Sequence, residues 1–555
     1  MRILIILSFL FVIFSFIPSF YEIYQSAKIP SNRVFVLEHN YMFDYNFYLS
    51  RIRQGQEGRW TVSEKYYNRP HSGSFFQIFY LMIGKIGGVF RLDPPMVYHT
   101  ARLLLGLIFL ILISRYLRGI FSGWWAIPAF LLAVTLGSWP IPIWFHNFWR
   151  FATYMGWWSA VDSLQRITFL PHVLLGQIFI LLFIWRFSET SNSLKYLKLI
   201  IWGIAGLIVG IIFPPTLIIV YTVFGVLSVL EFSFTRSHLA SQGETFIKQI
   251  IPRLLFIFLS FPSFLYLKVM FQVMPWSALA LFDIEHRMPL PYKEYALALG
   301  PLLPLGLAGL LVALIKKEKK LFASVSWILA VIILIVVFEK VPQQSPLRWT
   351  EAAVHIPLGI LVAYFFFQLY KFIGHTFTRS HVLVSKIGVW IIVAGIIVMG
   401  LGIMGSMVLW LTDQATWKRE ATWTVPIGAQ LAYPLKDFME GVYYLRDNTK
   451  GEEVVLAYIT AGNFIPAYAG NFVYIGHANT PDEDAKEKIA AEFYSGKMKS
   501  NDAKEFLRRE NISYIFFGPQ ERELGRIEDL TAYYSFISPI YNNKQVIIYK
   551  VDKSS

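Results

Sequence analysis

The sequence predicts a polytopic α-helical membrane protein that carries a small α/β domain at its C-terminal end. Apolar runs long enough to cross a bilayer recur between Ile3 and Leu411, and only 15% of the 555 residues are charged. Beyond that point the apolar runs shorten, the charge rises, and strand-like and helix-like segments alternate. We therefore expect a transmembrane domain over residues 1–412 and an extracytoplasmic α/β domain over residues 413–555.

The basic residues set the predicted orientation of the spans. The formal net charge is +14, but Lys and Arg are dispersed over short loops between apolar runs, which favours membrane topology over nucleic-acid binding. Basic loops near residues 115, 190, 245, 318 and 378 are placed in the cytoplasm by this rule. The result is a multi-pass cell-membrane protein with about eleven spans, a cytoplasmic N-terminus and an extracytoplasmic C-terminal domain. There is no cysteine, which excludes disulfides and thiolate sites.

The order of the spans follows from three local features. The first apolar run, within residues 1–20, lacks a small-residue cleavage site and is interpreted as a retained span, with a cleaved signal as the alternative. Residues 21–98 then form the first outside loop, in which the run at 75–90 is too short for a span and predicts an interfacial or re-entrant helix. Pro214 and Pro215 predict a tight outside turn between two spans, with a kink in one long helix as the alternative.

The C-terminal domain shows both periodicities. Its predicted strands are "EEVVLAYI", "NFVYIGHA", "ISYIFFG" and "KQVIIYKV". Its predicted helices are "PLKDFMEGVYYLRDN", "DEDAKEKIAAEFYSG" and "NDAKEFLRRE".

The first outside loop holds the strongest candidate residues, in "EHNYMFDYNFYLSRIRQGQEG". This stretch predicts a short helix that begins near Asp44 and ends at Gly55 and Gly58. Helical spacing places Asp44, Tyr48 and Arg51 on one face. The apolar residues predicted to face the membrane are Phe43, Phe47 and Leu49.

Asp44 has two interpretations that the sequence leaves equally open. It is either the N-cap of its own helix or a general base or metal ligand. Glu38 and His39 come just before it, and polar loop residues of this kind are not needed for packing.

Further candidates lie in later outside loops. His146 and Asp162 belong to the loop at 140–166, where Asp162 is equally well explained as a helix cap. His172, at the mouth of a span, is either functional or bonded to a neighbouring helix. Arg348 lies where the chain re-enters the membrane, and a guanidinium binds phosphate oxygens well; the alternative is an interfacial arginine that snorkels.

The first span, the outside loop with its acidic residues, the interfacial run "FFQIFYLMIGKIGG" and the soluble outside domain resemble the GT-C superfamily of membrane glycosyltransferases. That group includes protein O-mannosyltransferases, the aminoarabinose transferase of lipid A and the catalytic subunit of oligosaccharyltransferase. Its members often carry two acids in the first loop that are adjacent or have one residue between them. Here Glu38 and Asp44 are six positions apart.

The resemblance implies a sugar donor linked to a polyprenyl phosphate, and an acceptor that is a glycan, a lipid or a protein. Asp44 is then the base, supported by Glu38 and Asp162, while Arg348 and Arg51 bind the donor phosphate. The resemblance names no certain cofactor and leaves a divalent metal ion as a possible one.

Two other functions are weighed against the transferase. A flippase for lipid-linked sugars would also have many spans and arginines, but transporters usually show repeated halves and broken helices at the midplane. A non-catalytic scaffold would need no acids near the first span. Phosphate-binding loops, HExxH and GxSxG motifs do not occur in the sequence.

Overall fold

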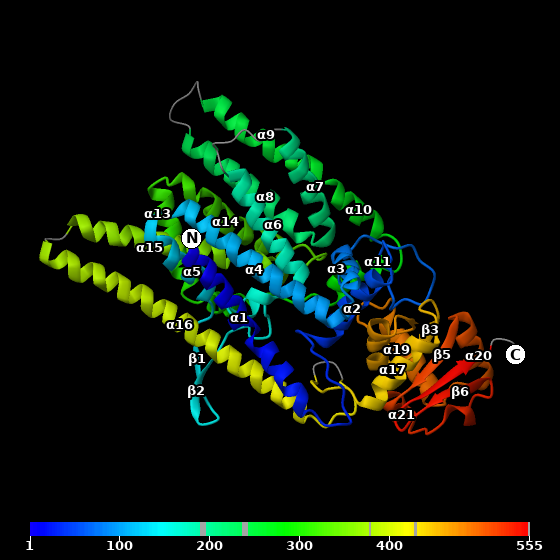
Figure 1. Cartoon of the computed structure of the whole chain (residues 1–555). Coiled ribbons are helices and arrows are strands. Elements are labelled where there is room, and N and C mark those ends of the chain that lie inside the picture. Colours follow the sequence, from blue (N-terminus) through cyan, green and yellow to red (C-terminus); the bar gives the residue numbers. More distant parts are fainter. Residues whose placement is uncertain (189–195, 236–241, 377–378, 427–429, 553–555) are drawn as a thin grey trace. The chain divides into compact units, whose positions relative to one another are not determined.

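The computed structural model describes residues 1–188, 196–235, 242–376, 379–426 and 430–552 (Figure 1). It forms two compact units, each described by itself below. Unit 1 consists of Met1–Ile17, Ala101–Leu267 and His286–Trp410, and unit 2 consists of Pro18–Thr100, Lys268–Glu285 and Leu411–Ser555. The predicted cytoplasmic loops near residues 190, 245 and 378 lie partly outside the described residues.

Long apolar helices dominate the chain, as predicted. They are α1 (Arg2–Gln25), α4 (Pro94–Ile120), α5 (Ala126–Thr135), α6 (Pro171–Ser188), α7 (Tyr196–Ile212), α8 (Pro215–Thr235), α9 (Gln242–Ser260), α10 (Pro262–Met270), α12 (Tyr292–Leu299), α13 (Leu302–Ile315), α14 (Phe322–Glu339), α15 (His355–Thr376) and α16 (Arg379–Glu420). Among the described residues, eight helices are long and apolar enough to cross a membrane, or nine if α12 and α13, bent by 77°, form one broken span. The expected number of about eleven is reached only if the shorter apolar helices at Gly123–Thr135 and Leu197–Ile212 also cross.

The proline pair marks a chain reversal. Helix α7 ends at Ile212 and α8 begins at Pro215. Helices α7 and α9 run in the same direction, because Gly203 faces the side chain of Leu259 and Gly206 faces that of Ser260; further along α7, Gly210 faces Ser263 at the start of α10. The intervening α8 must therefore run the other way. This arrangement favours the predicted turn over the kinked single helix.

A β-hairpin occupies the loop before Asp162, which the sequence analysis did not predict. Strands β1 (Ile141–Phe145) and β2 (Phe148–Ala152) pair antiparallel, with Phe145 opposite Phe148. The two residues between them, His146 and Asn147, both have positive φ angles, 49° and 66°. Two left-handed residues form the turn that matches the strand twist, and Asn tolerates that conformation.

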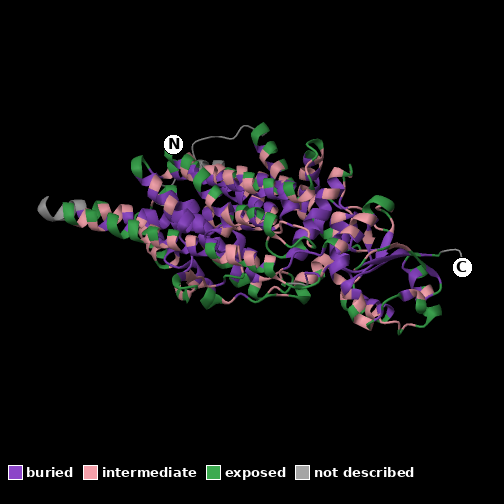
Figure 2. Ribbon diagram, turned by 60° about the horizontal axis from the view of Figure 1, so that its bottom comes forward, coloured by how far each residue is buried: buried purple, intermediate pink, exposed green. Residues whose placement is uncertain are grey.

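Unit 2 contains the predicted α/β domain. Its five strands are β3 (Val454–Leu456), β4 (Phe472–Val473), β5 (Ile512–Phe517), β6 (Ile537–Asn542) and β7 (Ile547–Val551), in the order β4-β3-β5-β7-β6. The helices are α17 (Lys436–Asn448), α18 (Ile459–Tyr468), α19 (Glu483–Tyr494), α20 (Ser500–Arg509) and α21 (Pro519–Gly525). Strand β5 is buried along its whole length, as befits a central strand, and most of the sheet is coloured as buried in Figure 2.

All four predicted strands and all three predicted helices of this domain are present. The sequence analysis missed β6, which carries Pro539 and lies at the edge of the sheet. Proline has no backbone N–H to donate to a neighbouring strand, so it is confined to edge strands. Its presence therefore weakened the strand pattern of β6 in the sequence. It also missed α18 and α21.

The first outside loop packs with the C-terminal residues inside unit 2. The amide of Val473 on β4 donates to the carbonyl of Lys65 at 2.9 Å. Asn46 donates from Nδ2 to Oδ1 of the buried Asn463 at 2.8 Å. Residues 21–98 are therefore bonded directly to the α/β sheet and to α18.

The loop contains two short helices, α2 (Met42–Gln56) and α3 (Ile78–Val89). The 12 residues of α3 span about 18 Å, which is short of a ~30 Å hydrocarbon core and agrees with the predicted non-spanning segment. The two helices touch through their backbones, since a Cβ added to Gly55 would meet the Leu81 carbonyl oxygen at 2.0 Å and one added to Gly84 would meet that of Ile52 at 2.0 Å. This contact fixes the helix that carries Asp44.

Candidate functional site

Asp44 lies in the first turn of α2 but does not cap it. The N-cap residue is Tyr41, whose side chain makes no cap hydrogen bond. The prediction that Asp44 is the N-cap is therefore wrong. Its side chain is 53% exposed, so a carboxylate is held at the surface of unit 2 without a packing role.

His477, which the sequence did not point to, lies within ion-pair distance of Asp44. Its Nε2 lies 3.4 Å from Oδ1 of Asp44, and its ring is almost completely buried. The Nδ1 atom accepts the amide N–H of Asn479 at 3.0 Å. A neutral imidazole that accepts at Nδ1 carries its proton on Nε2. That nitrogen is buried and makes no hydrogen bond among the described residues, so it meets the Asp44 carboxylate at ion-pair distance only. The available signal was position, because His477 is the next-to-last residue of the predicted strand "NFVYIGHA".

A stack of planar groups supports this histidine. The His477 ring packs on the Phe47 ring with centroids 4.5 Å apart. The Arg51 guanidinium also lies over the Phe47 ring, 3.4 Å from its centroid. The prediction that Phe47 faces the membrane is therefore wrong. Helical side chains lean back over the preceding turn, which brings Arg51 onto Phe47.

Arg51 is used inside the fold. Its side chain is fully buried, and Nη2 bonds the buried carboxylate of Glu64 at 2.5 Å. Its Nε donates to Gln77 at 3.1 Å. A guanidinium with these partners is a weaker candidate for the donor phosphate than one that reaches the surface.

Glu38 is also enclosed. Its carboxylate lies 3.3 Å from Nζ of Lys418, which in turn contacts Glu22 at 2.9 Å. Burial raises the pKa of Glu38, and the charge of Lys418 opposes that shift. The geometry gives Glu38 a partner inside the protein and leaves Asp44 as the exposed member of the predicted acidic pair.

His39 contacts the start of α4. Its Nδ1 lies 3.0 Å from the Tyr98 hydroxyl, and its ring meets that of His99 edge-on at 6.4 Å. Tyr48, predicted on the Asp44 face, stacks on Tyr80 at 4.5 Å. These contacts make the N-terminal part of the loop an aromatic layer beside α2.

In unit 1, Asp162 caps a local turn. Its Oδ1 accepts the amides of Leu164 at 3.0 Å and Gln165 at 2.8 Å, at the start of the 3₁₀ helix η3 (Gln165–Thr168). These bonds are of the kind that the helix-cap alternative expects, but the N-cap residue of η3 is Leu164 rather than Asp162. Burial raises the pKa of Asp162, while these amide bonds oppose the shift. Its Oδ2 is buried and has no hydrogen-bond partner among the described residues.

Arg348 retains access to the surface of unit 1. It lies in the 3₁₀ helix η5 (Pro346–Glu351), and its side chain is 32% exposed. Its Nη1 lies 3.3 Å from both carboxylate oxygens of Glu351, which is itself buried. Glu351 therefore orients the guanidinium without covering it.

The two remaining predicted histidines lie at different places in unit 1. His146 is at the exposed tip of the β1–β2 hairpin. His172, at the start of α6, meets the Phe213 ring edge-on at 5.7 Å. Asp44, Glu38, His39 and Arg51 belong to unit 2, so the structure groups the predicted residues into two sets.

The side chains around Asp44 do not form a recognisable metal-binding site. Among the residues that the structure describes, no three His, Cys, Asp or Glu side chains are placed to share one. Asp44 and His477 supply two donors only. We therefore assign no chemical step to a metal.

Comparison with solved structures places the fold. The oligosaccharyltransferase AglB from Archaeoglobus fulgidus, solved with an inhibitory peptide and a dolichol-phosphate, is 12% identical with a TM-score of 0.50, over 91% of this chain and 69% of that chain. ArnT from Cupriavidus metallidurans, solved with undecaprenyl phosphate, is 10% identical with a TM-score of 0.50, over 98% of each chain. No family model and no curated protein sequence matches. The chain shares the fold of these two proteins, which agrees with the fold that the sequence resemblance implied.

Proposed function

We propose that this protein is a membrane glycosyltransferase that moves a sugar from a polyprenyl-phosphate donor to an acceptor outside the membrane. The observation that carries the proposal is the GT-C fold over nearly the whole chain, together with a first-loop carboxylate, Asp44, that is exposed and lies 3.4 Å from Nε2 of the buried His477. The lipid phosphates in the two similar structures support a donor of that class.

In the proposed reaction a hydroxyl or amide group of the acceptor attacks the anomeric carbon of the sugar. Asp44 takes the proton of the attacking group, and the bond between the sugar and the phosphate oxygen breaks. The phosphate leaves on its lipid with the bonding electron pair. His477 is a positioning residue, because its buried ring lies 3.4 Å from the Asp44 carboxylate and limits the orientations that the carboxylate can adopt.

Arg348 is the proposed ligand of the departing phosphate. The group gains negative charge as it leaves, and a partly exposed guanidinium stabilises that charge. Arg348 is preferred to Arg51 because Arg51 is fully buried against Glu64.

The role of His477 is tested by removing its N–H but keeping its ring. His477→Phe preserves the stack on Phe47 and is expected to lower kcat about tenfold, with the KM for the donor unchanged. His477→Gln retains a donor group and is expected to keep more of the activity. Equal activity of His477→Phe and the native protein contradicts the positioning role.

The role of Arg348 is tested with Arg348→Gln, which can still donate to Glu351. Loss of charge-assisted bonds to the phosphate is expected to raise the donor KM about tenfold to a hundredfold. The matched control is Lys340→Gln, which removes an exposed charge from the same loop. If both variants raise KM equally, the effect is one of general electrostatics and Arg348 is not the ligand.

The proposed function itself is tested with protein purified into lipid nanodiscs. A panel of polyprenyl-phosphate sugars is supplied with cell-envelope extract as acceptor, and release of free polyprenyl phosphate is followed by mass spectrometry. Release that depends on the protein supports the transferase. Movement of intact donor across sealed vesicles without release supports a flippase instead, and neither event over the whole panel supports a scaffold.

A further inference from the structure

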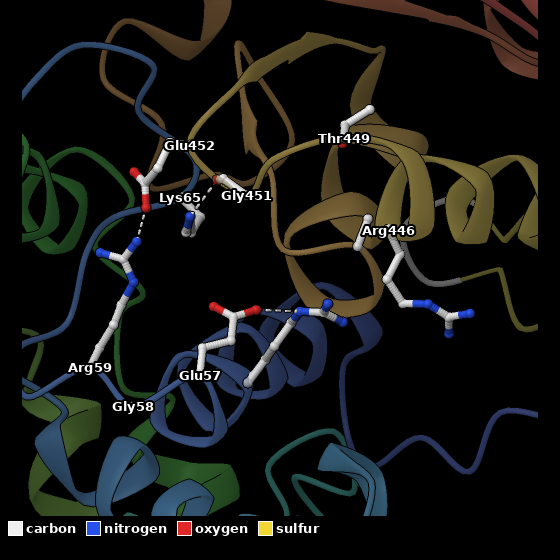
Figure 3. Close-up of a pocket in the computed structure, with 10 residues that line it drawn as sticks. Glu57, Gly58, Arg59, Lys65, Arg446, Thr449, Gly451 and Glu452 are labelled. Carbon is white, nitrogen blue, oxygen red and sulfur yellow. Dashed lines mark hydrogen bonds and ion pairs between the residues drawn. The ribbon is translucent and has the colours of Figure 1, made fainter.

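A polar cavity of about 520 Å³ lies in unit 2, apart from Asp44 (Figure 3). Its walls come from the C-terminal end of α2 with the following turn and from the loops around β3. It is lined by Arg53, Glu57, Gly58, Arg59, Lys65, Arg446, Thr449, Gly451, Glu452 and Ala469. Arg53 is nine residues along α2 from Asp44, which is about 13 Å at the helical rise per residue.

The lining carries more positive than negative charge. Four cations face two carboxylates, and both carboxylates are taken: Glu57 pairs with Arg53 at 2.8 Å, and Glu452 pairs with Arg59. The pairs are drawn as dashed lines in Figure 3, which also shows Arg59 and Arg446 on opposite sides of Glu57 in that view.

Lys65 is the most unusual member. Its side chain is almost completely buried, and its Nζ donates to the Gly451 carbonyl at 2.8 Å and lies 3.9 Å from the centre of the Phe472 ring. Among the described residues, no carboxylate lies within ion-pair distance of it. Burying a cation without an anion is costly, and a bound anion removes that cost.

Arg446 is the second cation that a ligand can reach. It bonds the neighbouring Asp447 through Nε at 2.7 Å and Nη2 at 2.9 Å and lies 4.7 Å from the centre of the Tyr443 ring, and Asp447 is largely exposed. Exposed pairs of this kind are weak, so exchange for a ligand oxyanion has little cost. Guanidinium groups bind carboxylates and phosphates in a two-pronged way.

We propose that this cavity binds an oxyanion, a phosphate or carboxylate group, carried by a saccharide. The volume is in the range of small-molecule sites, and the strongly polar lining suits a hydroxyl-rich ligand rather than a lipid chain. The saccharide part of the proposal rests on the proposed transferase function. The oxyanion part rests on the charges of the cavity alone.

Binding is measured by calorimetry on the full chain in nanodiscs, with no donor present, using glucose 1-phosphate and glucuronate as probes. Neutral glucose and inorganic phosphate are the comparison ligands. We expect at least one acidic sugar to bind at least tenfold more tightly than either comparison ligand. Equal binding of inorganic phosphate and glucose 1-phosphate, with no binding of glucuronate, overturns the saccharide assignment; absence of binding by every anion overturns the site.

Two variants locate the binding. Lys65→Met and Arg446→Gln are each expected to weaken acidic-sugar binding at least tenfold, and Arg446→Gln leaves the buried contacts of the fold in place. Lys544→Gln, which removes an exposed cation elsewhere in unit 2, is the matched control and should bind as the native protein does. Equal weakening by the control overturns the site in favour of general charge attraction. Because turnover is not needed, Asp44→Asn should bind normally, and failure of the transferase assay leaves this result intact.

The dependence on pH gives an independent readout. Burial lowers the pKa of Lys65 to about 8, with Glu452 and Glu57 opposing the shift and Arg59 and Arg53 reinforcing it. A bound anion favours the protonated lysine, so affinity should fall as the pH rises above about 8. A pH-independent affinity between 7 and 9 in the native protein, with full affinity in Lys65→Met, excludes Lys65 from the site.

Discussion

Asp44→Asn is expected to lower the turnover number at least about a hundredfold, because a general base contributes roughly a hundredfold to ten-thousandfold to such a step. The amide cannot accept the proton of the attacking group, yet it has the same shape. Asp44 is 53% exposed and makes no capping bond, so the variant should fold and express as the native protein does. The measurement is donor-dependent release of polyprenyl phosphate at saturating donor.

Its matched control is Asp502→Asn, the same change at an exposed acid in the first turn of α20. That variant should keep full activity. If Asp44→Asn turns over at the native rate, Asp44 is not the general base, and Glu38 and Asp162 become the candidates for that role. An unfolded Asp44→Asn protein would instead mean that the carboxylate has a structural role that its exposure does not suggest.

Arg51→Met is expected to have the largest effect on stability. It leaves the Glu64 carboxylate buried without its cation, and breaking a buried pair in this way costs about 3–5 kcal/mol. The measurement is the apparent Tm and the half-life of the folded protein in one detergent. Per folded molecule, the donor KM should not change, because Arg51 does not reach the surface.

The double variant Arg51→Met with Glu64→Gln separates charge from packing. Removing the orphaned charge is expected to recover more than half of the lost stability. Lys436→Met breaks an exposed pair with Glu440 in the same unit and should change stability by less than about 1 kcal/mol. A native Tm for Arg51→Met with a raised donor KM would restore Arg51 as a phosphate ligand.

The fold was largely predictable because a bilayer imposes a strong rule on the sequence. Every spanning segment must be apolar and must satisfy its own backbone, so apolar runs mark helices such as α14 and α16 directly. The strand-like and helix-like segments of the C-terminal part were also predictable from short stretches of sequence, and strands β5 and β7 were found in this way. The hairpin at His146 was missed because its signal is a two-residue turn inside an aromatic stretch that resembles interfacial anchoring.

The candidate site was predictable only in part. Asp44 was identified from its place in the topology, but its partner His477 lies on a distant part of the chain that periodicity cannot connect to it. The prediction that Arg51 shares a functional helix face with Asp44 failed because it used only the angular position of each residue around the helix axis. The guanidinium leans back over Phe47 and reaches Glu64, a contact that depends on how the loop folds rather than on the helix.

The bonding of the first loop to the end of the chain has a consequence for biosynthesis. Asn46 and its partner Asn463 are 417 residues apart, and every span of unit 1 between them leaves the ribosome first. Helix α2 can pack on α3 early in translation, but its contacts with Asn463 and His477 form only after those residues have been synthesised. A chain that stops before Asn463 contains Asp44 but lacks both of these partners.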